Sequence, residues 1–391
     1  MLASKRRRNR GSKSAACRRA ALILGSRSWI ALSNGRRTRD VELSETSEIL
    51  FERCGTAGVV ILNRPQALNA VTHGMVRALA VKLAAWANDD AVTRVIVTAA
   101  PGRAFSAGGD LRALYELGRA GRYDEALAYW RDEYRLNTLI KHYRKPYVAL
   151  IDGVVMGGGV GISIHGSHRV AGDAFTFAMP EVGIGFFPDV GATWLLPRLP
   201  GELGTYCALT GDRLEAADAI GCGIATHRVK SAAFPDLLEG LCSAVAVDAL
   251  LAAFAQPPGE GVLMRHRGAI EHLFQATRVE EILARLDAEV GVDGEFARAA
   301  AATIRAKSPV SLKVALALLR RGRTLDFNEC MRAEYRVVSR IVRAEDLYEG
   351  IRAVIIDKDQ APRWRPSTLE AISDAEVERY FAPLAHELDL T

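Results

Sequence analysis

Two glycine-rich segments are the part of the sequence best placed to act on a carbonyl group. They are residues 106–110 (SAGGD) and 156–161 (MGGGVG), and each follows a strand-like run and precedes a helix-like one. A helix N-terminus offers free N–H groups and the positive end of the helix dipole, and glycine lets an oxygen approach the backbone closely. Two such loops could each give one N–H to the oxyanion that forms on an acyl carbonyl. Each loop taken alone also fits tight packing between a strand and a helix.

Two acidic residues in an apolar setting could supply the second part of such a reaction. Glu181 and Asp189 lie eight residues apart in the segment FTFAMPEVGIGFFPDVG (175–191). Burial among Phe, Met, Ile and Val side chains would raise the pKa of a carboxyl group, as is common for a general base or a nucleophile. Glu181 alone is equally consistent with a structural role, and Asp189 could instead cap a helix.

The elements that must position these residues alternate between strands and helices. Runs of β-branched and apolar residues predict strands at residues 58–62, 95–98, 147–151 and 174–178, with a loop at 153–159. Helical spacing predicts a helix at 76–86, one capped by Asp110, and one that carries Ile162 and Ile164. Beyond about residue 205, helices are predicted at residues 237–254, 279–286, 296–306 and 312–319. This order predicts an α/β core followed by a mainly helical region.

Charge and breaker residues divide the chain into three parts. Residues 1–39 contain 12 Lys and Arg and no acid, whereas the other 352 residues contain 39 basic and 46 acidic residues and carry a formal charge of −7. Residues 1–45 are predicted to be a basic, disordered tail, a targeting segment, or upstream sequence from a wrongly assigned start codon. The core is predicted at residues 46–256 and the helical C-terminal region at 257–391, because two prolines and two glycines lie between residues 256 and 261. The acidic core argues against nucleic acid as a partner.

Several other function classes lack their sequence signals. No run approaches the roughly 18 apolar residues of a membrane span. The cysteines form no CxxC pair, HExxH is absent, and neither glycine segment fits GxxxxGK[ST] or GxGxxG. His165 and His168 are expected to be polar residues at a helix end rather than metal ligands. A serine hydrolase centred on Ser163 is a rival reading, but GISIH lacks the final glycine of the GxSxG motif.

Four segments resemble, in their order and spacing, the enoyl-CoA hydratase/isomerase superfamily, also called the crotonase superfamily. They are LNRPQALNAV (62–71), GRAFSAGGDL (102–111), KPYVALIDGVVMGGGVG (145–161) and FAMPEVGIGFFPDVG (177–191). Within the superfamily, RDEYRLN (131–137) and the C-terminal segments SPVSLK, EYRVVSR and IDKDQAPRWRP most resemble the 3-hydroxyisobutyryl-CoA hydrolase subfamily. The resemblance spans roughly residues 46–385. It implies an α/β fold, a crotonase-like spiral of ββα units with a mainly helical C-terminal region.

The resemblance also implies roles for five residues. The backbone N–H groups of Gly109 and Gly158 match the oxyanion hole, which would bind the thioester carbonyl of the substrate. Glu181 matches the catalytic glutamate used by many of these enzymes. Asp189 and Glu133 match acidic residues that the hydrolase subfamily places around its hydroxyacyl group, so Asp189 is expected to be catalytic and substrate-binding and Glu133 substrate-binding.

Gly161 bears on which reaction is expected. Hydratases of the superfamily have a second catalytic glutamate at this position, and addition of water to a double bond uses both carboxylates. The resemblance therefore implies hydrolysis of a short 3-hydroxyacyl-CoA thioester, above all 3-hydroxyisobutyryl-CoA in valine catabolism, with Glu181 attacking directly or activating a water. The alternatives are an enoyl-CoA hydratase or isomerase that uses Glu181, and a CoA-binding module without activity.

The remaining expectations concern partners and location. The partner is an acyl-CoA substrate, of which coenzyme A is a part, with no metal, redox cofactor, nucleic acid or membrane, and homotrimers or hexamers are common in the superfamily. Arg64 and Arg103 are candidates for contact with the CoA phosphates, although a surface role is favoured for each. A ratio of 42 Arg to 9 Lys favours a GC-rich bacterial genome and the cytoplasm, with the mitochondrial matrix as the alternative. Residues 192–194 depart from the usual pattern after PDVG, which leaves the preferred acyl-chain length open.

Overall fold

The computed structural model describes residues 39–42 and 46–390. The tail or targeting segment predicted at residues 1–45 lies outside the described residues, apart from 39–42. Those four residues form strand β1 (Arg39–Glu42), which pairs antiparallel with β2 (Ile49–Cys54). From Arg39 onward the chain forms one compact unit.

Two sheets form the framework of this unit. The larger sheet has the order β1, β2, β3 (Ala57–Leu62), β4 (Arg94–Ala99), β6 (Tyr147–Ile151), β8 (His168–Ala171), β11 (His227–Arg228). The smaller sheet has the order β10 (Leu214–Glu215), β9 (Thr176–Ala178), β7 (Val154–Met156), β5 (Ala104–Ser106). From β3 to β11 all neighbours in the larger sheet are parallel, and in the smaller sheet β5, β7 and β9 are parallel.

Successive strands alternate between the two sheets. The pairs β4 and β5, β6 and β7, and β8 and β9 each place one strand in the larger sheet and the next in the smaller. A helical segment follows each pair: α3 (Leu111–Arg119), α5 (Gly158–Gly161) and η3 (Glu181–Ile184). This repeated ββα unit is the spiral implied by the family resemblance. It brings three strand-to-helix turns together at the carboxyl ends of the strands of the smaller sheet.

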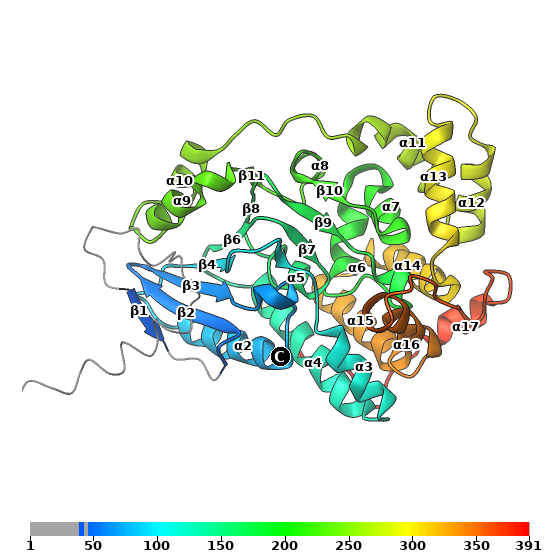
Figure 1. The fold of residues 1–391 in the computed structure, drawn as a ribbon, viewed down its shortest axis with the longest axis horizontal. Helices are drawn as coiled ribbons and strands as arrows, with labels where there is room; N and C mark the ends of the chain where they lie inside the picture. The colour runs from blue at the N-terminus through cyan, green and yellow to red at the C-terminus, as the bar shows by residue number, and fades with distance from the viewer. Residues whose placement is uncertain (1–38, 43–45, 391) are drawn as a thin grey trace, which may run out of the picture. The chain divides into compact units, whose positions relative to one another are not determined.

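The helices pack around this framework and are shown in Figure 1. Those before residue 260 are α2 (His73–Ala87), α3, α4 (Tyr123–Lys141), α5, α6 (Ala192–Leu195), α7 (Leu203–Thr210), α8 (Ala216–Gly221), α9 (Phe234–Leu241) and α10 (Val247–Phe254). Those after it are α11 (Arg267–Phe274), α12 (Val279–Ala288), α13 (Gly294–Arg305), α14 (Pro309–Gly322), α15 (Phe327–Ile341), α16 (Glu345–Ile351) and α17 (Asp374–Arg379). Residues of α14 and α15 belong to the same buried hydrophobic cluster as those of β2 and β3, so the C-terminal helices complete the core.

Most local predictions agree with these elements. The predicted strands at 58–62, 95–98 and 147–151 correspond to β3, β4 and β6, and Asp110 caps α3 by accepting the N–H of Ala113. The predicted loop at 153–159 is wrong in part, because it contains the three-residue strand β7. The predicted helix at 237–254 is two helices, since Ser243 Oγ donates to the Gly240 carbonyl and accepts from Val245 N–H between them.

Two further differences lie close to the glycine segments. The helix expected to carry Ile162 and Ile164 is the short α5, which ends at Gly161. Strand β8 was not predicted. Among the described residues, no helix combines the length and apolar character that crossing a bilayer requires.

Candidate active site

The three turns at the edge of the smaller sheet line a cavity of about 370 Å³. Because β5, β7 and β9 are parallel neighbours, their carboxyl ends lie together and deliver the turns to one place. All five residues singled out in the sequence line this cavity: Gly109, Gly158, Glu133, Glu181 and Asp189. They come from segments up to 80 residues apart in the chain.

The amides of Gly109 and Gly158 face one another across a short gap. A Cβ atom built on Gly158 would lie 3.3 Å from the Gly109 nitrogen, so the two N–H groups border the same small space. Gly158 is the first residue of α5 and has no acceptor for its N–H within the helix. The bridge that fixes the first loop uses the N–H groups of Val71 and Asp110, not that of Gly109. Two amides that border one space could together bind an oxyanion.

Glu181 lies beside these amides at the start of η3. Its side chain is buried, and its Oε1 lies 3.2 Å from the place where a Cβ on Gly157 would stand. Among the described residues, no donor reaches its Oε2 atom. Burial raises the pKa of Glu181 to about 8. A desolvated carboxyl group with a free oxygen next to an oxyanion hole can act as a nucleophile or a general base.

Two tyrosines of α4 hold the other predicted acids. Tyr129 Oη donates to Glu133 Oε1 at 3.0 Å, and Tyr134 Oη donates to Asp189 Oδ2 at 2.9 Å. Burial raises the pKa of Glu133 to about 8, and burial followed by the charges of neighbouring acids raises that of Asp189. Asp189 does not cap α6, whose N-cap is Gly191. Neither tyrosine was predicted to contact these acids, although the spacing of four between Tyr129 and Glu133 on a helix was a usable signal.

A fourth buried acid, Glu334 of α15, fixes the turn after Asp189. It is fully buried and accepts the N–H groups of Gly191 and Thr193, each at 2.9 Å. Burial raises its pKa to about 7. Glu334 lies in the segment EYRVVSR, but no role was predicted for it. An acid within the apolar face of a helix was the signal that could have identified it.

The four acids influence one another through space. The charges of Glu133, Glu334 and Glu181, in that order after burial, raise the pKa of Asp189. Like charges in a dry site cannot all be ionised at neutral pH, so the cluster holds protons there. A proton shared in this cluster is available to a departing or arriving group.

Gly161 has no space for a larger side chain. A Cβ on Gly161 would lie 2.5 Å from Asn137 Nδ2 and 2.9 Å from Val190 Cβ. Neither polar atom of the Asn137 amide has a partner among the described residues, and the amide is fully buried. Asn137 and Val190 therefore occupy the space that a side chain at position 161 would need, where hydratases are expected to have a second glutamate.

Replacing Gly161 by Ala is therefore expected to destabilise the fold. Overpacking of this kind costs roughly 1–3 kcal/mol, so the urea midpoint of unfolding should fall. Gly74→Ala, in the first turn of α2, is the matched control, because its Cβ would meet nothing closer than Thr72 Oγ1 at 3.8 Å. An unchanged midpoint for Gly161→Ala would show that the 137–161 contact yields easily.

The C-terminal helices supply the far wall of the cavity. Leu347 and Ile351 of α16 line it, as do Trp130 and Phe186, whose rings stack at 5.6 Å. Lys307 also lines it, and burial lowers the pKa of its ammonium group. These contacts have no local sequence signal, because packing between distant helices creates them.

The geometry argues against the serine hydrolase that the sequence left as a rival reading. Ser163 is buried and its Oγ donates to the Gly159 carbonyl at 2.6 Å, and His165 Nε2 bonds the Val190 carbonyl at 2.6 Å, so the pair forms no nucleophile and base. Arg64 is held by Glu48 and Asp110 rather than free to bind phosphate. Arg103 is exposed.

This chain is similar to known proteins over most of its length. Residues 57–381 match the family described as enoyl-CoA hydratase/isomerase. The chain is 44% identical over 350 residues to the mitochondrial 3-hydroxyisobutyryl-CoA hydrolase of Danio rerio, covering 86% of this chain and 90% of that protein. It is 40% identical to the human protein of the same name, covering 86% and 89%.

Two solved structures are similar in fold and sequence. A carnitinyl-CoA dehydratase from Mycobacterium thermoresistibile matches with a TM-score of 0.83 and 44% identity, covering 88% of this chain and 99% of that one. An enoyl-CoA hydratase from Rhodobacter sphaeroides matches with a TM-score of 0.81 and 40% identity, covering 86% and 98%.

Proposed function

Because the chain belongs to the enoyl-CoA hydratase/isomerase family, we propose that its cavity hydrolyses an acyl-CoA thioester, 3-hydroxyisobutyryl-CoA, to 3-hydroxyisobutyrate and CoA. This is a step of valine catabolism. The observation that carries the proposal is the pairing of Glu181 with two adjacent backbone amides while the position of a second catalytic glutamate is closed.

That observation also separates hydrolysis from hydration. The curated relatives are named hydrolases, whereas the similar solved structures are named dehydratase and hydratase. Hydration of a double bond needs one group to activate water and another to protonate carbon. Gly161 offers no carboxylate at the position that is expected to supply the second group in hydratases, whereas thioester hydrolysis needs one carboxylate and an oxyanion hole.

The proposed reaction begins with the thioester carbonyl bound by the amides of Gly109 and Gly158. Glu181 then either attacks the carbonyl carbon, which gives an anhydride that water opens, or removes a proton from an attacking water. In both routes a new C–O bond replaces the C–S bond. The CoA thiolate leaves and takes a proton, and the developing negative charge rests on the carbonyl oxygen between the two amides.

The two routes for Glu181 can be separated chemically. An anhydride at Glu181 would react with hydroxylamine during turnover, and mass spectrometry of the digested protein would find the hydroxamate on that residue. A general base forms no covalent intermediate and leaves Glu181 unlabelled.

Glu133 and Asp189 are proposed to recognise the hydroxyl group of the substrate. Both acids line the cavity and each is oriented by a tyrosine of α4. A site built to bond a hydroxyl discriminates strongly against an analogue that lacks it, because buried polar groups are then left without partners.

Replacing Glu133 by Leu should therefore reduce selectivity for the hydroxyl group. The ratio of kcat/KM for 3-hydroxyisobutyryl-CoA to that for isobutyryl-CoA is expected to fall by about tenfold or more. Glu125→Leu, on the exposed side of the same helix, is the control and should leave the ratio unchanged. Equal losses for both substrates would assign Glu133 to the chemical step instead.

The test of the proposed function is release of CoA thiol from 3-hydroxyisobutyryl-CoA, measured with a thiol-reactive dye. Hydration of crotonyl-CoA is followed in parallel by its absorbance. Rapid thiol release without hydration supports the hydrolase. Hydration without thiol release would support the enoyl-CoA hydratase or isomerase instead, and silence in both assays would support a CoA-binding module.

Further parts of the proposal concern the CoA phosphates, the cofactors, the cellular location and the assembly. Lys307, at the cavity wall, is proposed to meet a CoA phosphate in place of Arg64 and Arg103. The steps above use only side chains and amides of the chain, with no metal or redox cofactor. We also propose a bacterial cytoplasmic location, with the mitochondrial matrix as the alternative because the relatives are named mitochondrial, and assembly as trimers or hexamers. Import of a fluorescent protein carrying residues 1–45 and light scattering of the full chain test these two points.

A further inference from the structure

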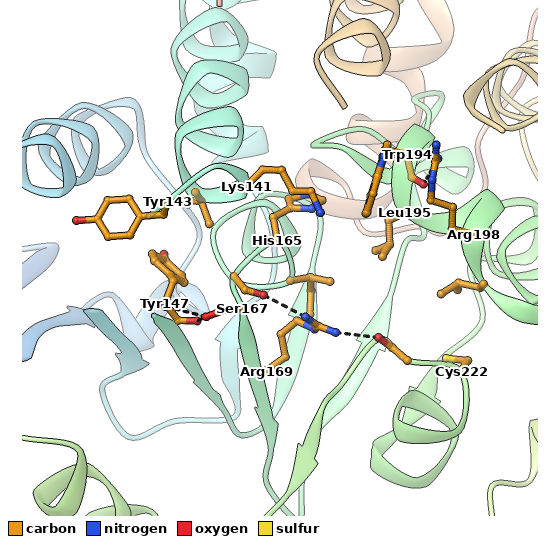
Figure 2. A pocket seen from close by; sticks show the side chains of 15 residues that line it. Lys141, Tyr143, Tyr147, His165, Ser167, Arg169, Trp194, Leu195, Arg198 and Cys222 are labelled. Atoms are coloured by element: carbon orange, nitrogen blue, oxygen red, sulfur yellow. Dashed lines mark hydrogen bonds between the residues drawn. The ribbon is translucent and has the colours of Figure 1, made fainter. Parts of the chain in front are cut away.

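A second cavity, of about 480 Å³, lies away from the active-site cavity, and the two share no lining residue. Its walls come from the C-terminal end of α4, the segment after α5, strand β8 and the residues from α6 to Leu199. Figure 2 shows Lys141, Arg169, Trp194 and Arg198 gathered around it. The proposed function uses none of these residues.

The charged side chains that line this cavity are all basic. Three cations, Lys141, Arg169 and Arg198, line it, and no Asp or Glu does. Within the described part of the chain, none of the three lies within ion-pair distance of a carboxylate. His165 also lines the cavity, but burial lowers its pKa to about 4, so it is neutral at pH 7.

Backbone carbonyls and one aromatic ring hold the cations in place. Arg169 donates to the carbonyls of Gly166, Gly223 and Ile224 at 2.8–3.1 Å. The Trp194 ring lies between Lys141, 3.6 Å from its centroid, and Arg198, 4.7 Å from it (Figure 2). Carbonyl oxygens and a ring face orient a cation without neutralising its charge.

The cations also disfavour one another. Burial, and then the charges of Arg169 and Arg198, lower the pKa of Lys141. Lys141 and Arg169 are partly desolvated beside the exposed Arg198, and a bound anion would relieve the cost of keeping these like charges together. The apolar remainder of the wall, which includes Ile140, Ile164 and Leu199, has room for a short hydrocarbon part.

We propose that this cavity is a second binding site, which takes a small anion bearing a phosphate or carboxylate group. Lys141, Arg169 and Arg198 bind the charged group. The site is separate from the CoA site, and its occupation does not require the catalytic reaction.

The location of the site gives it two connections to the catalytic residues. Helix α4 carries Glu133 in one cavity and Lys141 in the other, about two turns away. The segment that carries Asp189 continues to Trp194, and His165 bonds the Val190 carbonyl between them.

The test is calorimetric titration of the full chain with inorganic phosphate and, separately, with isobutyrate, at constant ionic strength set by chloride. Saturable binding of either anion is expected, and the stronger ligand identifies the preferred head group. Lys141→Gln and Arg198→Gln should each weaken binding by about tenfold, the loss of a charge-assisted contact. Arg144→Gln removes an exposed cation outside the cavity and should change Kd by no more than about twofold.

Competition with CoA separates this site from the active site. Saturating CoA should leave the Kd for phosphate or isobutyrate unchanged, and the Glu181→Gln variant should bind the anion like the wild type. The proposal would be overturned if neither anion bound, or if Lys141→Gln and Arg198→Gln both bound the anion with wild-type affinity. Displacement of the anion by CoA would overturn it as well. None of these results depends on thioester hydrolysis.

Discussion

Replacing Glu181 by Gln is expected to lower kcat for thiol release from 3-hydroxyisobutyryl-CoA by about 10³-fold, with little change in KM. Gln keeps the size of the side chain but can neither attack the carbonyl carbon nor accept a proton from water. Glu181 Oε1 lies beside Gly157, next to the Gly158 amide, and its Oε2 has no donor among the described residues, so Glu181 is the acid expected to act. Stopped assays of CoA thiol, with substrate well above and below KM, measure both constants.

The matched control is Glu215→Gln. Glu215 belongs to β10 of the same small sheet, pairs with Thr176 of β9 and is exposed. Its replacement should leave kcat within about twofold of the wild type. A variant at Glu181 that keeps more than a tenth of the activity would transfer the catalytic role to Asp189 or Glu133.

The pH dependence of kcat/KM should also reflect the ionisation of Glu181. Glu181 acts when ionised, and burial raises its pKa to about 8. For the wild type, kcat/KM is therefore expected to rise with pH, to be half-maximal near pH 8 and to level off about one pH unit above it. The residual activity of Glu181→Gln should not show this rise, and an identical profile in both proteins would assign it to another acid of the cluster.

The free energy of unfolding of the wild type should fall over the pH range in which its kcat/KM rises. The pKa of Glu181 is about 8 when folded, against 4.5 for an exposed glutamate, so folding favours its protonated form. That contribution is complete below the unfolded pKa and is lost as pH rises through about 8. Gln does not ionise, so the Glu181→Gln variant does not lose this stability as pH rises. The difference between its Tm and the Tm of the wild type should therefore increase in favour of the variant between about pH 5 and pH 9.

The parts of the site that could be predicted have local signals. The turns at Gly109 and Gly158 follow short apolar strands and open helices, and Glu181 follows β9 directly. These features depend on residues close together in the chain. Asp189 was identified together with Glu181 from its apolar setting, the family motifs added Glu133, and all five residues line the cavity.

The parts that could not be predicted arise from distant contacts. Glu334 reaches the turn after Asp189 from α15, more than 140 residues later, and Lys307 and Leu347 close the cavity from the C-terminal region. Hydrophobic periodicity shows that a helix has an apolar face but not what that face covers. Strand β8 and the break between α9 and α10 were also missed, because short strands and side-chain interruptions leave little periodic signal.

Gly161 shows how sequence and structure complement each other. The sequence shows that a carboxylate is missing where hydratases have one. The structure adds that Asn137 and Val190 occupy the space beside it. The loss of the carboxylate is thus part of the packing of α4 against α5, and restoring a glutamate at position 161 would require both neighbours to move.

A methyl group at position 158 is expected to remove most of the activity while the chain stays folded. In Gly158→Ala, the new Cβ would lie 3.3 Å from the Gly109 nitrogen and 2.6 Å from Glu133 Oε1. An oxyanion held by both amides must lie about 2.7–3.1 Å from each nitrogen, which is the space the methyl group would fill. The loss should be about 10²–10³-fold in kcat, the effect of losing one donor of an oxyanion hole. Gly268→Ala, on α11 with no atom within 4 Å of its Cβ, is the control.

The choice of substrate separates the two contacts of that methyl group. If it acts by filling the oxyanion hole, thiol release from 3-hydroxyisobutyryl-CoA and from isobutyryl-CoA should fall by the same factor, because both share the thioester carbonyl. If it acts only by displacing Glu133, the hydroxylated substrate should lose more, as in Glu133→Leu. Equal losses with an unchanged Tm would support the amides of Gly109 and Gly158 as the oxyanion hole, and full activity in Gly158→Ala would show that the thioester carbonyl binds elsewhere in the cavity.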